Sequence, residues 1–514
     1  MRFNLYLGAA ALAFAMPASA AWQQASSKHF LIYGDMPVEE MKAYATKLET
    51  FDAAARLIRS MKDPKVGDGN RVHVYVVPTD LDVNRTLGSA DSGVLGYYED
   101  DVRGPFIITP RKVRRDLDNR NFAPEHVFFH EYTHHLQLQS SNRPMPAWLS
   151  EVFAEFLGNP IFFEDGSIGL GTPAEDRAAA IIKGRWAPLA DLLEGNAITL
   201  SYAGFWGQNY AQGWLLNHYL AFEPSRKGQI DDYVRRISAG EDSLAAARAA
   251  FGDIGKLENE LRSYSRTEKF AYLKIDATKL NVPPVTVTAM SPAQSELMMM
   301  RIYAKTGYDA LSASRVLKAV REIATKAPSD SLVMRTLAQV EYDNGNYDEA
   351  GVAADAAMKA DPTSTEAMVF KGRSFLGKAR KTNDPALFKE AREWFIKANK
   401  ADTEDPEPLY LYYRSYRDAN QPAPQAAIDA LKYAAILAPR DLKLQVRLGI
   451  EYLRQNRLAE AKAALEPVAY MPHGVAEPKY AKQALDMIAS GNGQDAVSLL
   501  EKEVILSDDK DDPA

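Results

Sequence analysis

The stretch His130-Glu131-Tyr132-Thr133-His134 lies within a run of residues whose apolar side chains recur with helical periodicity. Residues four apart on a helix lie one above the other, so the imidazoles of His130 and His134 project from one face and can bind one ion together. Imidazole nitrogens hold Zn²⁺ at about 2.0–2.1 Å, and a neighbouring carboxylate such as Glu131 can take a proton from a zinc-activated water. The stretch therefore predicts half of a catalytic zinc site, and the alternative is a merely solvated polar helix.

A third zinc ligand is expected from a second helix that follows Pro144 and Pro146. Glu151 and Glu155 lie four apart there and share a more polar edge. A buried ionised carboxylate is costly unless it pairs or binds a metal, so we expect Glu151 as the third ligand and Glu155 as a support for a histidine or for the helix. The alternative is a solvent-facing pair. The remaining stripe is apolar and suits packing on the first helix: Trp148, Leu149, Val152, Phe153, Phe156 and Leu157.

Two further histidines flank the motif. His126 stands four residues before His130, but the helical rise places it roughly 12 Å from His134, too far for all three to share one ion. We expect a supporting or surface position for His126. His135 points about 100° away from His134 and is expected to be a polar residue on the flank of the helix.

The two motifs, His130-Glu131-Tyr132-Thr133-His134 and Pro146-Ala147-Trp148-Leu149-Ser150-Glu151, followed by Ala154-Glu155, resemble those of the gluzincin metallopeptidases. This is the thermolysin and aminopeptidase-like superfamily, and the likeness is greatest to its small bacterial members. The resemblance implies one zinc ion per chain, held by His130, His134 and Glu151, with Glu131 as the general base. The chain has Val152 where those families usually have glycine, so crowding near the substrate cleft is possible, and its gap from His134 to Glu151 is slightly shorter.

A hydrogen-bond donor for the oxyanion is also implied by the resemblance, because gluzincins commonly take a Tyr or His from a later helix. Tyr210, at the start of a helical segment, is similar in position, and such a donor is worth on the order of 3 kcal/mol in the transition state. The chain has 25 tyrosines, so a packing role is the alternative for Tyr210. Tyr202 or His218 could serve instead.

The N-terminus has the pattern of a secretory signal peptide. Met1-Arg2 is a charged start, an apolar run follows from Leu5 to Met16, and Ala18-Ser19-Ala20 is a small-residue cleavage site. We expect cleavage after Ala20 and a periplasmic or secreted protein. No other apolar stretch approaches about 20 residues, so no membrane span is expected. The absence of cysteine leaves zinc with histidine and carboxylate ligands.

Composition favours two globular domains. The 514 residues are too many for a single hydrophobic core. The net charge of −7, from 61 basic and 68 acidic residues, does not indicate a nucleic-acid-binding protein. From Trp22 to about Arg120 the pattern is mixed α/β, with strands expected at residues 29–33, 71–77, 94–98 and 106–109 and a helix at 38–61. The strand at 106–109 is our candidate for an edge that pairs with an extended peptide, and a central strand is the alternative.

Prolines recur in the second half at Pro328, Pro362, Pro406, Pro439 and Pro472, with spacings of 34, 44, 33 and 33 and one insertion near residues 378–384. A period near 34 in helical pairs is the signature of tetratricopeptide (TPR) repeats. Small and aromatic packing residues fall in register with it: Leu337, Ala338, Gly345, Tyr347, Ala350, Ala357, Leu448, Gly449, Tyr452 and Ala461. Stacked units bury a continuous core and form a concave groove, so we expect this half to bind a protein or peptide partner.

The sequence thus predicts an α+β zincin-like metallopeptidase domain followed by an all-α TPR solenoid. The expected boundaries are 1–20 for the signal peptide, 21–266 for the peptidase domain, 267–290 for a linker, 291–504 for the repeats and 505–514 for a disordered acidic tail. The expected function is that of an exported zinc-dependent peptidase. The alternative is a non-catalytic TPR scaffold with a degenerate metallopeptidase-like binding domain.

Overall fold

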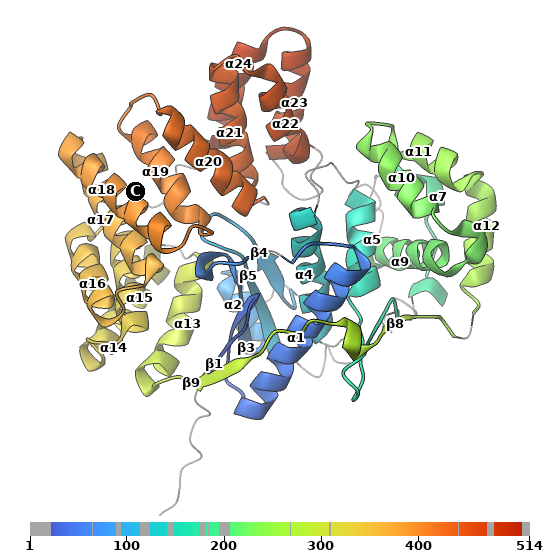
Figure 1. The fold of residues 1–514 in the computed structure, drawn as a ribbon, viewed down its shortest axis with the longest axis horizontal. Coiled ribbons are helices and arrows are strands. Elements are labelled where there is room, and N and C mark those ends of the chain that lie inside the picture. The colour runs from blue at the N-terminus through green and yellow to red at the C-terminus, as the bar shows by residue number, and fades with distance from the viewer. Residues whose placement is uncertain are drawn as a thin grey trace, which may run out of the picture.

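The computed structural model describes residues 22–63, 65–88, 94–113, 124–140, 147–173, 180–182, 184–194, 206–267, 269–307, 310–439, 441–469 and 477–505. The expected signal peptide, Tyr202 and the acidic tail from residue 506 onward lie outside these ranges. Most of the described chain is helical, and one six-stranded sheet stands near its middle (Figure 1). No helix among the described residues is both long and apolar enough to cross a lipid bilayer.

The sheet has the strand order β4-β5-β3-β2-β1-β9. Its strands are β1 (Gln23–Ser26), β2 (Phe30–Gly34), β3 (Val72–Thr79), β4 (Tyr97–Glu99), β5 (Phe106–Lys112) and β9 (Thr286–Ala289). β2, β3 and β5 are parallel, whereas β4, β1 and β9 run antiparallel to their neighbours. The expectation that residues 106–109 form an edge was wrong, because β4 pairs with β5 along its outer side and is itself the edge.

The two faces of this sheet belong to different cores, as the alternation of side chains along a strand requires. Phe30 and Ile32 point to a core shared with α1 (Val38–Ile58) and α4 (Pro124–Ser140). Leu31 and Tyr33, one residue out of step, point to a core shared with the first helices of the C-terminal half. The sheet is therefore buried on both sides, which explains why its central strands are almost continuously apolar.

A helical lobe follows the α4 helix. It consists of α5 (Ala147–Leu157), α7 (Leu189–Leu193), α9 (Trp206–Phe222), α10 (Gln229–Ser238), α11 (Ser243–Phe251) and α12 (Ile254–Tyr264). A small antiparallel sheet, β6 (Ile161–Phe162), β7 (Ile168–Leu170) and β8 (Leu273–Ile275), lies beside it. The interval 267–290, interpreted from sequence as a linker, contributes β8 to this sheet and β9 to the large one.

The C-terminal half is a solenoid of stacked helices, as its repeat period predicts. Its helices are α13 (Pro292–Thr306), α14 (Ala310–Lys326), α15 (Ser331–Asp343), α16 (Tyr347–Ala360), α17 (Thr365–Thr382), α18 (Pro385–Ala401), α19 (Pro406–Asp418), α20 (Gln425–Leu437), α21 (Leu442–Arg454), α22 (Leu458–Ala469), α23 (Glu477–Ala489) and α24 (Gly493–Leu500). The insertion near residue 380 lengthens the C-terminal end of α17 and the N-terminal end of α18.

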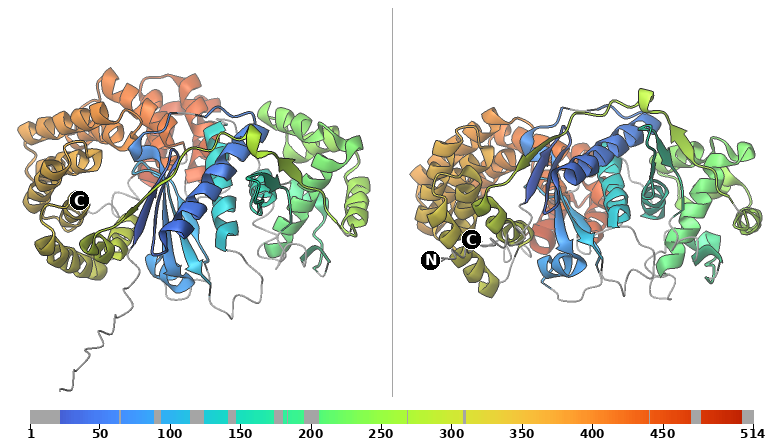
Figure 2. Two further views of the ribbon diagram at one scale, coloured as in Figure 1. Left: turned by 60° about the horizontal axis from the view of Figure 1, so that its bottom comes forward. Right: turned by 90° about the horizontal axis from the view of Figure 1, so that it is seen from below.

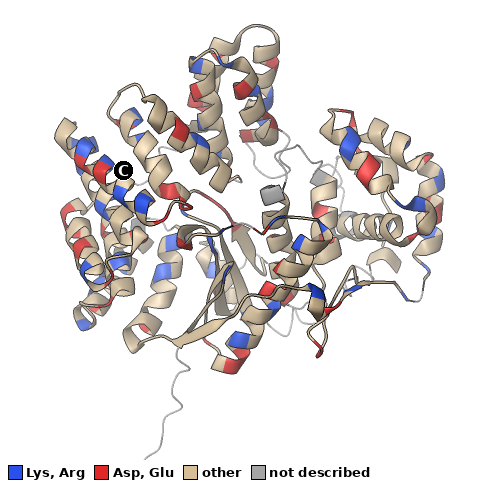
Figure 3. Ribbon diagram, viewed as in Figure 1, with Lys and Arg blue, Asp and Glu red and all other residues tan. Residues whose placement is uncertain are grey.

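Small residues let the solenoid helices approach closely. A Cβ atom at Gly449 would lie 2.8 Å from the side chain of Leu465, and one at Gly377 would lie 2.6 Å from the ring of Tyr347. Both glycines therefore mark points where one helix backbone touches a side chain of its neighbour, and bulkier residues would push the helices apart. Lys, Arg, Asp and Glu are interspersed along the described solenoid helices in the view of Figure 3, which shows no cationic stripe there.

The solenoid curves around the face of the sheet opposite α1 and α4 (Figure 2). Loops before β3 and β5 reach its helix ends: the amide of Gly69 donates to Asp402 (3.1 Å), and the amide of Val102 donates to Asp441 (3.1 Å). The ammonium of Lys305 on α13 donates to the carbonyl of Arg103. The inner side of the repeats thus faces the protein's own sheet across a shared core.

Candidate metal centre

The α4 helix is fixed to the sheet by the residues between its two candidate histidines. Phe128 and Tyr132 are fully buried, their rings stack with centroids 5.6 Å apart, and both pack on Phe30 of β2. The Tyr132 hydroxyl donates to Asp52 of α1 at 2.7 Å. Since these contacts fix one face of α4, another face of the helix presents His130 and His134 in a fixed direction.

The α5 helix brings Glu151 opposite these histidines. Its apolar stripe is buried as predicted except for Phe153, which is half-buried. Trp148 also donates from its indole nitrogen to the Tyr233 hydroxyl at 3.0 Å. Val152 is only 1% exposed, and a Cβ atom at Gly213 of α9 would lie 2.3 Å from its Cγ2. Val152 is accommodated by this glycine inside the core, so the structure gives no support for the crowding of the cleft that the sequence made possible.

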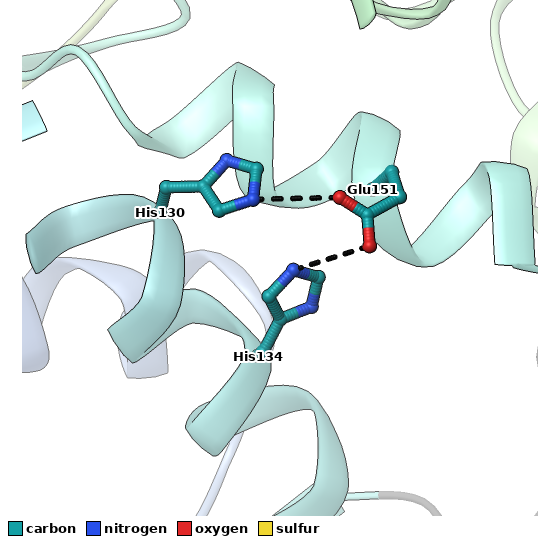
Figure 4. Close-up of side chains that lie close together, drawn as sticks. All are labelled: His130, His134 and Glu151. Carbon is teal, nitrogen blue, oxygen red and sulfur yellow. Dashed lines mark ion pairs between the residues drawn. The ribbon is translucent and has the colours of Figure 1, made fainter. Parts of the chain in front are cut away.

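His130, His134 and Glu151 converge, with one ligand atom of each within 4.8 Å of the others. Nε2 of His130 lies 3.4 Å from Oε2 of Glu151, and Nε2 of His134 lies 3.5 Å from Oε1 of the same carboxylate (Figure 4). Two ligands at about 2.0–2.1 Å from a tetrahedral ion are roughly 3.3–3.4 Å apart. The three side chains therefore fit one zinc ion by donor type and by spacing.

Glu155 holds the outer nitrogen of the first histidine. Its Oε1 lies 3.1 Å from Nδ1 of His130, and its side chain is 1% exposed, so the solvent-facing alternative for this residue is excluded. Burial opposes protonation of His130, but the contacts with Glu151 and Glu155 and the charge of Glu131 outweigh it and raise its pKa to about 10. The surroundings of His130 thus strongly favour positive charge, as a site for a cation requires.

A serine and a glutamine hold the outer nitrogen of the second histidine. Ser150 donates its hydroxyl proton to Oε1 of Gln137 at 2.7 Å, and Gln137 donates its amide back to the Ser150 carbonyl at 3.0 Å. The Ser150 oxygen lies 3.2 Å from Nδ1 of His134 and, its own proton being used, accepts from that nitrogen. This pairing leaves the lone pair of His134 on Nε2, the nitrogen that faces Glu151.

Ser150→Ala is expected to weaken zinc binding by about 10–100-fold, the usual loss when the support of a ligating histidine is removed. The hydroxyl fixes the tautomer of His134, and no other change in packing follows from losing one oxygen atom. Competition with a chelating dye measures the dissociation constant. Ser225→Ala, at an exposed serine bonded only to Glu223 among the contacts described, is the control and should bind zinc like the wild type. A Ser150→Ala protein with wild-type zinc affinity would contradict the role given to this hydroxyl.

Of the other candidate residues, Glu131 and Tyr210 lie at the metal centre and His218 does not. Glu131 is half-buried on α4 next to His130, and the ring of Tyr210 on α9 lies 6.2 Å from the ring of His130, so both are at the centre. His218 donates from Nε2 to the carbonyl of Ala271 (2.8 Å) and accepts from the Tyr264 hydroxyl at Nδ1 (2.9 Å). Both nitrogens of His218 are thus engaged within the helical lobe, and we do not place it at the centre.

His126 and His135 take part in the fold. His126 is buried, and its Nδ1 lies 2.8 Å from the carbonyl of Gly158, so it joins the start of α4 to the end of α5. His135 was expected to be a polar flank residue, but it is buried, stacks on Tyr132 and lies 2.7 Å from the hydroxyl of Tyr98. This contact joins α4 to the edge strand β4, which the sequence pattern of α4 alone could not indicate.

A second group of potential ligands, His29, Glu49 and Asp52, is fully buried beneath α4. Nδ1 of His29 lies 2.7 Å from Glu49 and its Nε2 lies 3.0 Å from Asp63. Asp52 accepts from Tyr132 and from Nε of Arg56 at 2.8 Å. The polar groups of this cluster satisfy one another, so we assign it to anchoring α4 on α1. Sequence reasoning missed it because its members are 80 to 103 residues from Tyr132.

Comparisons with known proteins assign no family to this chain. No protein-family model matches it, and no curated protein matches it. Among solved structures, the crystal structure of the yeast Tom70 is similar over 74% of this chain and 75% of the Tom70 chain. The sequence identity is 14% and the TM-score is 0.25. A likeness with so low a TM-score carries no argument about fold or function, so the function is inferred from the site itself.

Proposed function

We propose that this protein is an exported zinc-dependent metallopeptidase that hydrolyses peptide bonds. The observation that carries the proposal is the convergence of His130, His134 and Glu151 at zinc-ligand spacing. Glu131, on the same turn of α4, is the general base. The zincin-like character of the N-terminal domain and the gluzincin resemblance belong to this proposal, as does export through the N-terminal signal peptide.

Each residue around the proposed zinc site has a separate role in the hydrolysis. Zinc, when bound, would lower the pKa of an attacking water to about 7 and polarise the scissile carbonyl. Glu131 takes the proton from the attacking water and passes it to the leaving amine. Tyr210 donates a hydrogen bond to the oxyanion, for which its position beside His130 is suitable. Glu155 and Ser150 keep the two histidines in the tautomers that offer Nε2.

The edge strand β4 is the proposed place for an extended substrate. Among the described residues β4 pairs with β5 on one side only, and it is joined to α4 through Tyr98 and His135. An extended peptide added to such an edge gains main-chain hydrogen bonds and needs little sequence specificity. Substrate peptides would then lie alongside the helix that carries the general base.

A peptide library incubated with the purified protein tests the proposal, with cleavage products identified by mass spectrometry. We expect cleavage by the zinc-loaded protein, loss of cleavage after a chelator, and recovery on adding zinc back. Cleavage that persists in excess chelator would contradict a metal-dependent mechanism. Absence of cleavage across the library, with zinc bound at one ion per chain, would favour the second candidate function.

That second candidate is a scaffold that binds proteins without cleaving them. The observation in its favour is the solenoid, because stacked helical repeats commonly present binding surfaces. In either case the repeats are proposed to recruit a protein or peptide partner through a surface other than their concave side, which the protein's own sheet covers. A scaffold gives no task to a carboxylate beside two paired histidines, so the position of Glu131 favours the enzyme.

A further inference from the structure

A cavity of about 580 Å³ lies between the sheet and the inner side of the solenoid. Its lining comes from β1, β2 and β3 on one side and from α13, α15, α17 and the start of α19 on the other. This is the face of the sheet opposite α4, so the cavity is separate from the metal centre. Its volume falls in the range of about 300–1,000 Å³ that is usual for small-molecule sites.

Three arginines in the lining of the cavity lie within reach of one another's partners. Arg301 of α13 donates to both oxygens of Glu366 at 2.9 Å, and Nε of Arg335 of α15 lies 3.1 Å from the same carboxylate. Arg71, before β3, pairs with Asp68. The side chain of Asp68 is 84% exposed, so solvent screens its charge and the ion pair is weak. The ion pairs of these three guanidinium groups thus involve two carboxylates, the half-buried Glu366 and the exposed Asp68.

Two of these arginines have an unsatisfied donor, which points to a missing acceptor. Arg301 is 6% exposed, and in the described part of the chain its Nε has no hydrogen-bond partner; the same holds for the buried Nε of Arg71. Buried donors normally find a partner, because leaving one unpaired costs about 1–3 kcal/mol. Burial raises the pKa of Glu366, but Arg301 and Arg335 outweigh it and lower the value to about 2, so this carboxylate is already ionised and fully used.

The neighbouring side chains suit an organic anion. The rings of Tyr33 and Tyr75 stack with centroids 5.5 Å apart and line the sheet side. Burial, and then the charges of Lys305 and Arg301, lower the pKa of His73 well below its usual range, so this lining residue is neutral at pH 7. The site therefore offers aromatic rings beside fixed positive charge.

Other acidic residues of the cavity lining are already hydrogen-bonded within the chain. Asp402 accepts from the amide of Gly69, and Asp405 accepts from the amide of Glu407 at 3.0 Å. The carboxylate of Glu407 in turn accepts from Nε of Arg373 at 3.0 Å. These acids hold the 67–70 loop and the start of α19 in place.

We propose that this cavity binds a small organic molecule through a carboxylate or phosphate group held by Arg71, Arg301 and Arg335. The protein's own sheet closes the concave side of the repeats, so the space left fits a compact ligand and not an extended polypeptide. The ligand would bridge the sheet of the metal-centre domain and the solenoid, and its binding would stabilise their contact. This inference is independent of the peptidase activity.

Isothermal titration calorimetry of the full mature chain with inorganic phosphate and with citrate, at constant ionic strength, tests the site. We expect the wild type to bind at least one of them at one molecule per chain; the anion that binds tells a phosphate ligand from a carboxylate ligand. Arg335→Gln should weaken binding at least tenfold, because one charge-assisted contact is lost. Arg301 remains to pair with Glu366 in that variant, so the fold should survive.

Arg457→Gln is the matched control. Arg457 pairs with Glu460 at 2.9 Å on the solenoid and is not part of the cavity lining, so its loss should leave the anion affinity unchanged. Arg335→Lys, which keeps the charge but not the planar fork, replaces Arg335→Gln if the latter melts early, and it should still weaken binding. A wild type that binds neither anion, or an Arg335 variant that binds as tightly as the wild type, overturns the proposal.

Discussion

Peptide hydrolysis by Glu131→Gln is expected to fall by at least about 10²–10⁴-fold, the usual cost of losing a general acid or base. The amide has the size of the carboxylate but cannot take a proton from the attacking water. Glu131 is half-buried and is not one of the converging ligands, so zinc occupancy and the melting temperature should stay close to those of the wild type. Single-turnover cleavage assays and metal analysis on the same preparation measure both quantities.

Glu125→Gln is the control for this variant. Glu125 lies on the same helix but forms an exposed ion pair with Lys47 at 3.0 Å, so its loss should leave cleavage unchanged. Tyr210→Phe should lower hydrolysis by a smaller factor, on the order of 10²–10³, through the lost oxyanion donor. If Glu131→Gln cleaves a substrate as fast as the wild type, Glu131 is not the base and the hydrolytic mechanism is wrong.

Removal of any one of His130, His134 and Glu151 by substitution with alanine is expected to abolish stoichiometric zinc binding. Two remaining ligands cannot hold the ion against water and buffer, whereas the three together match a zinc site in spacing. Glu155→Ala removes only the support of His130, so it should weaken binding by about 10–100-fold without abolishing it. Metal content per chain after gel filtration gives the comparison.

The outcome that would contradict this assignment is specific. If Glu151→Ala keeps one zinc per chain and Glu155→Ala loses it, the third ligand lies one turn further along α5. If all four variants keep their zinc, the ion is held elsewhere. The buried group of His29, Glu49 and Asp52 would then be the next candidate to mutate.

The sequence predicted the features that depend on local spacing. The helix expected around the motif from His130 to His134 is α4, and most of the apolar stripe of the next segment is the buried face of α5. His130, His134 and Glu151 could be grouped because two come from one helical turn and the third from the next helix along the chain. The solenoid was predictable for a similar reason, since a period near 34 repeats the same local packing.

Contacts between distant segments were not predictable in this way. Tyr132 and Asp52, or Lys305 and the Arg103 carbonyl, are joined only by the tertiary fold, and neither pair has a sequence signal. Residues 106–109 were the candidate edge although a strand at 94–98 was also expected, because the sequence does not show which strands pair with each other. Ser150 belongs to the motif that ends at Glu151, but its hydrogen bond with His134 depends on how α5 crosses α4.

The closure of the concave side by the protein's own sheet was also beyond the sequence. Residues 291–504 were expected to fold as a separate unit, yet Leu297 and Ile302 of α13 share a core with Tyr33 and Tyr75 of the sheet. Alternation along β2 and β3 predicts two buried faces but not what covers the second one. Strand β9, from the interval interpreted as a linker, completes this connection by pairing with β1.

The most direct test of the metal centre is an anomalous difference map from crystals of the zinc-loaded protein, recorded at the zinc absorption edge. We expect one strong peak per chain, at about 2.0–2.2 Å from Nε2 of His130, Nε2 of His134 and the carboxylate of Glu151. A peak at another group of side chains, or no peak among these three residues at full zinc occupancy, would contradict the assignment.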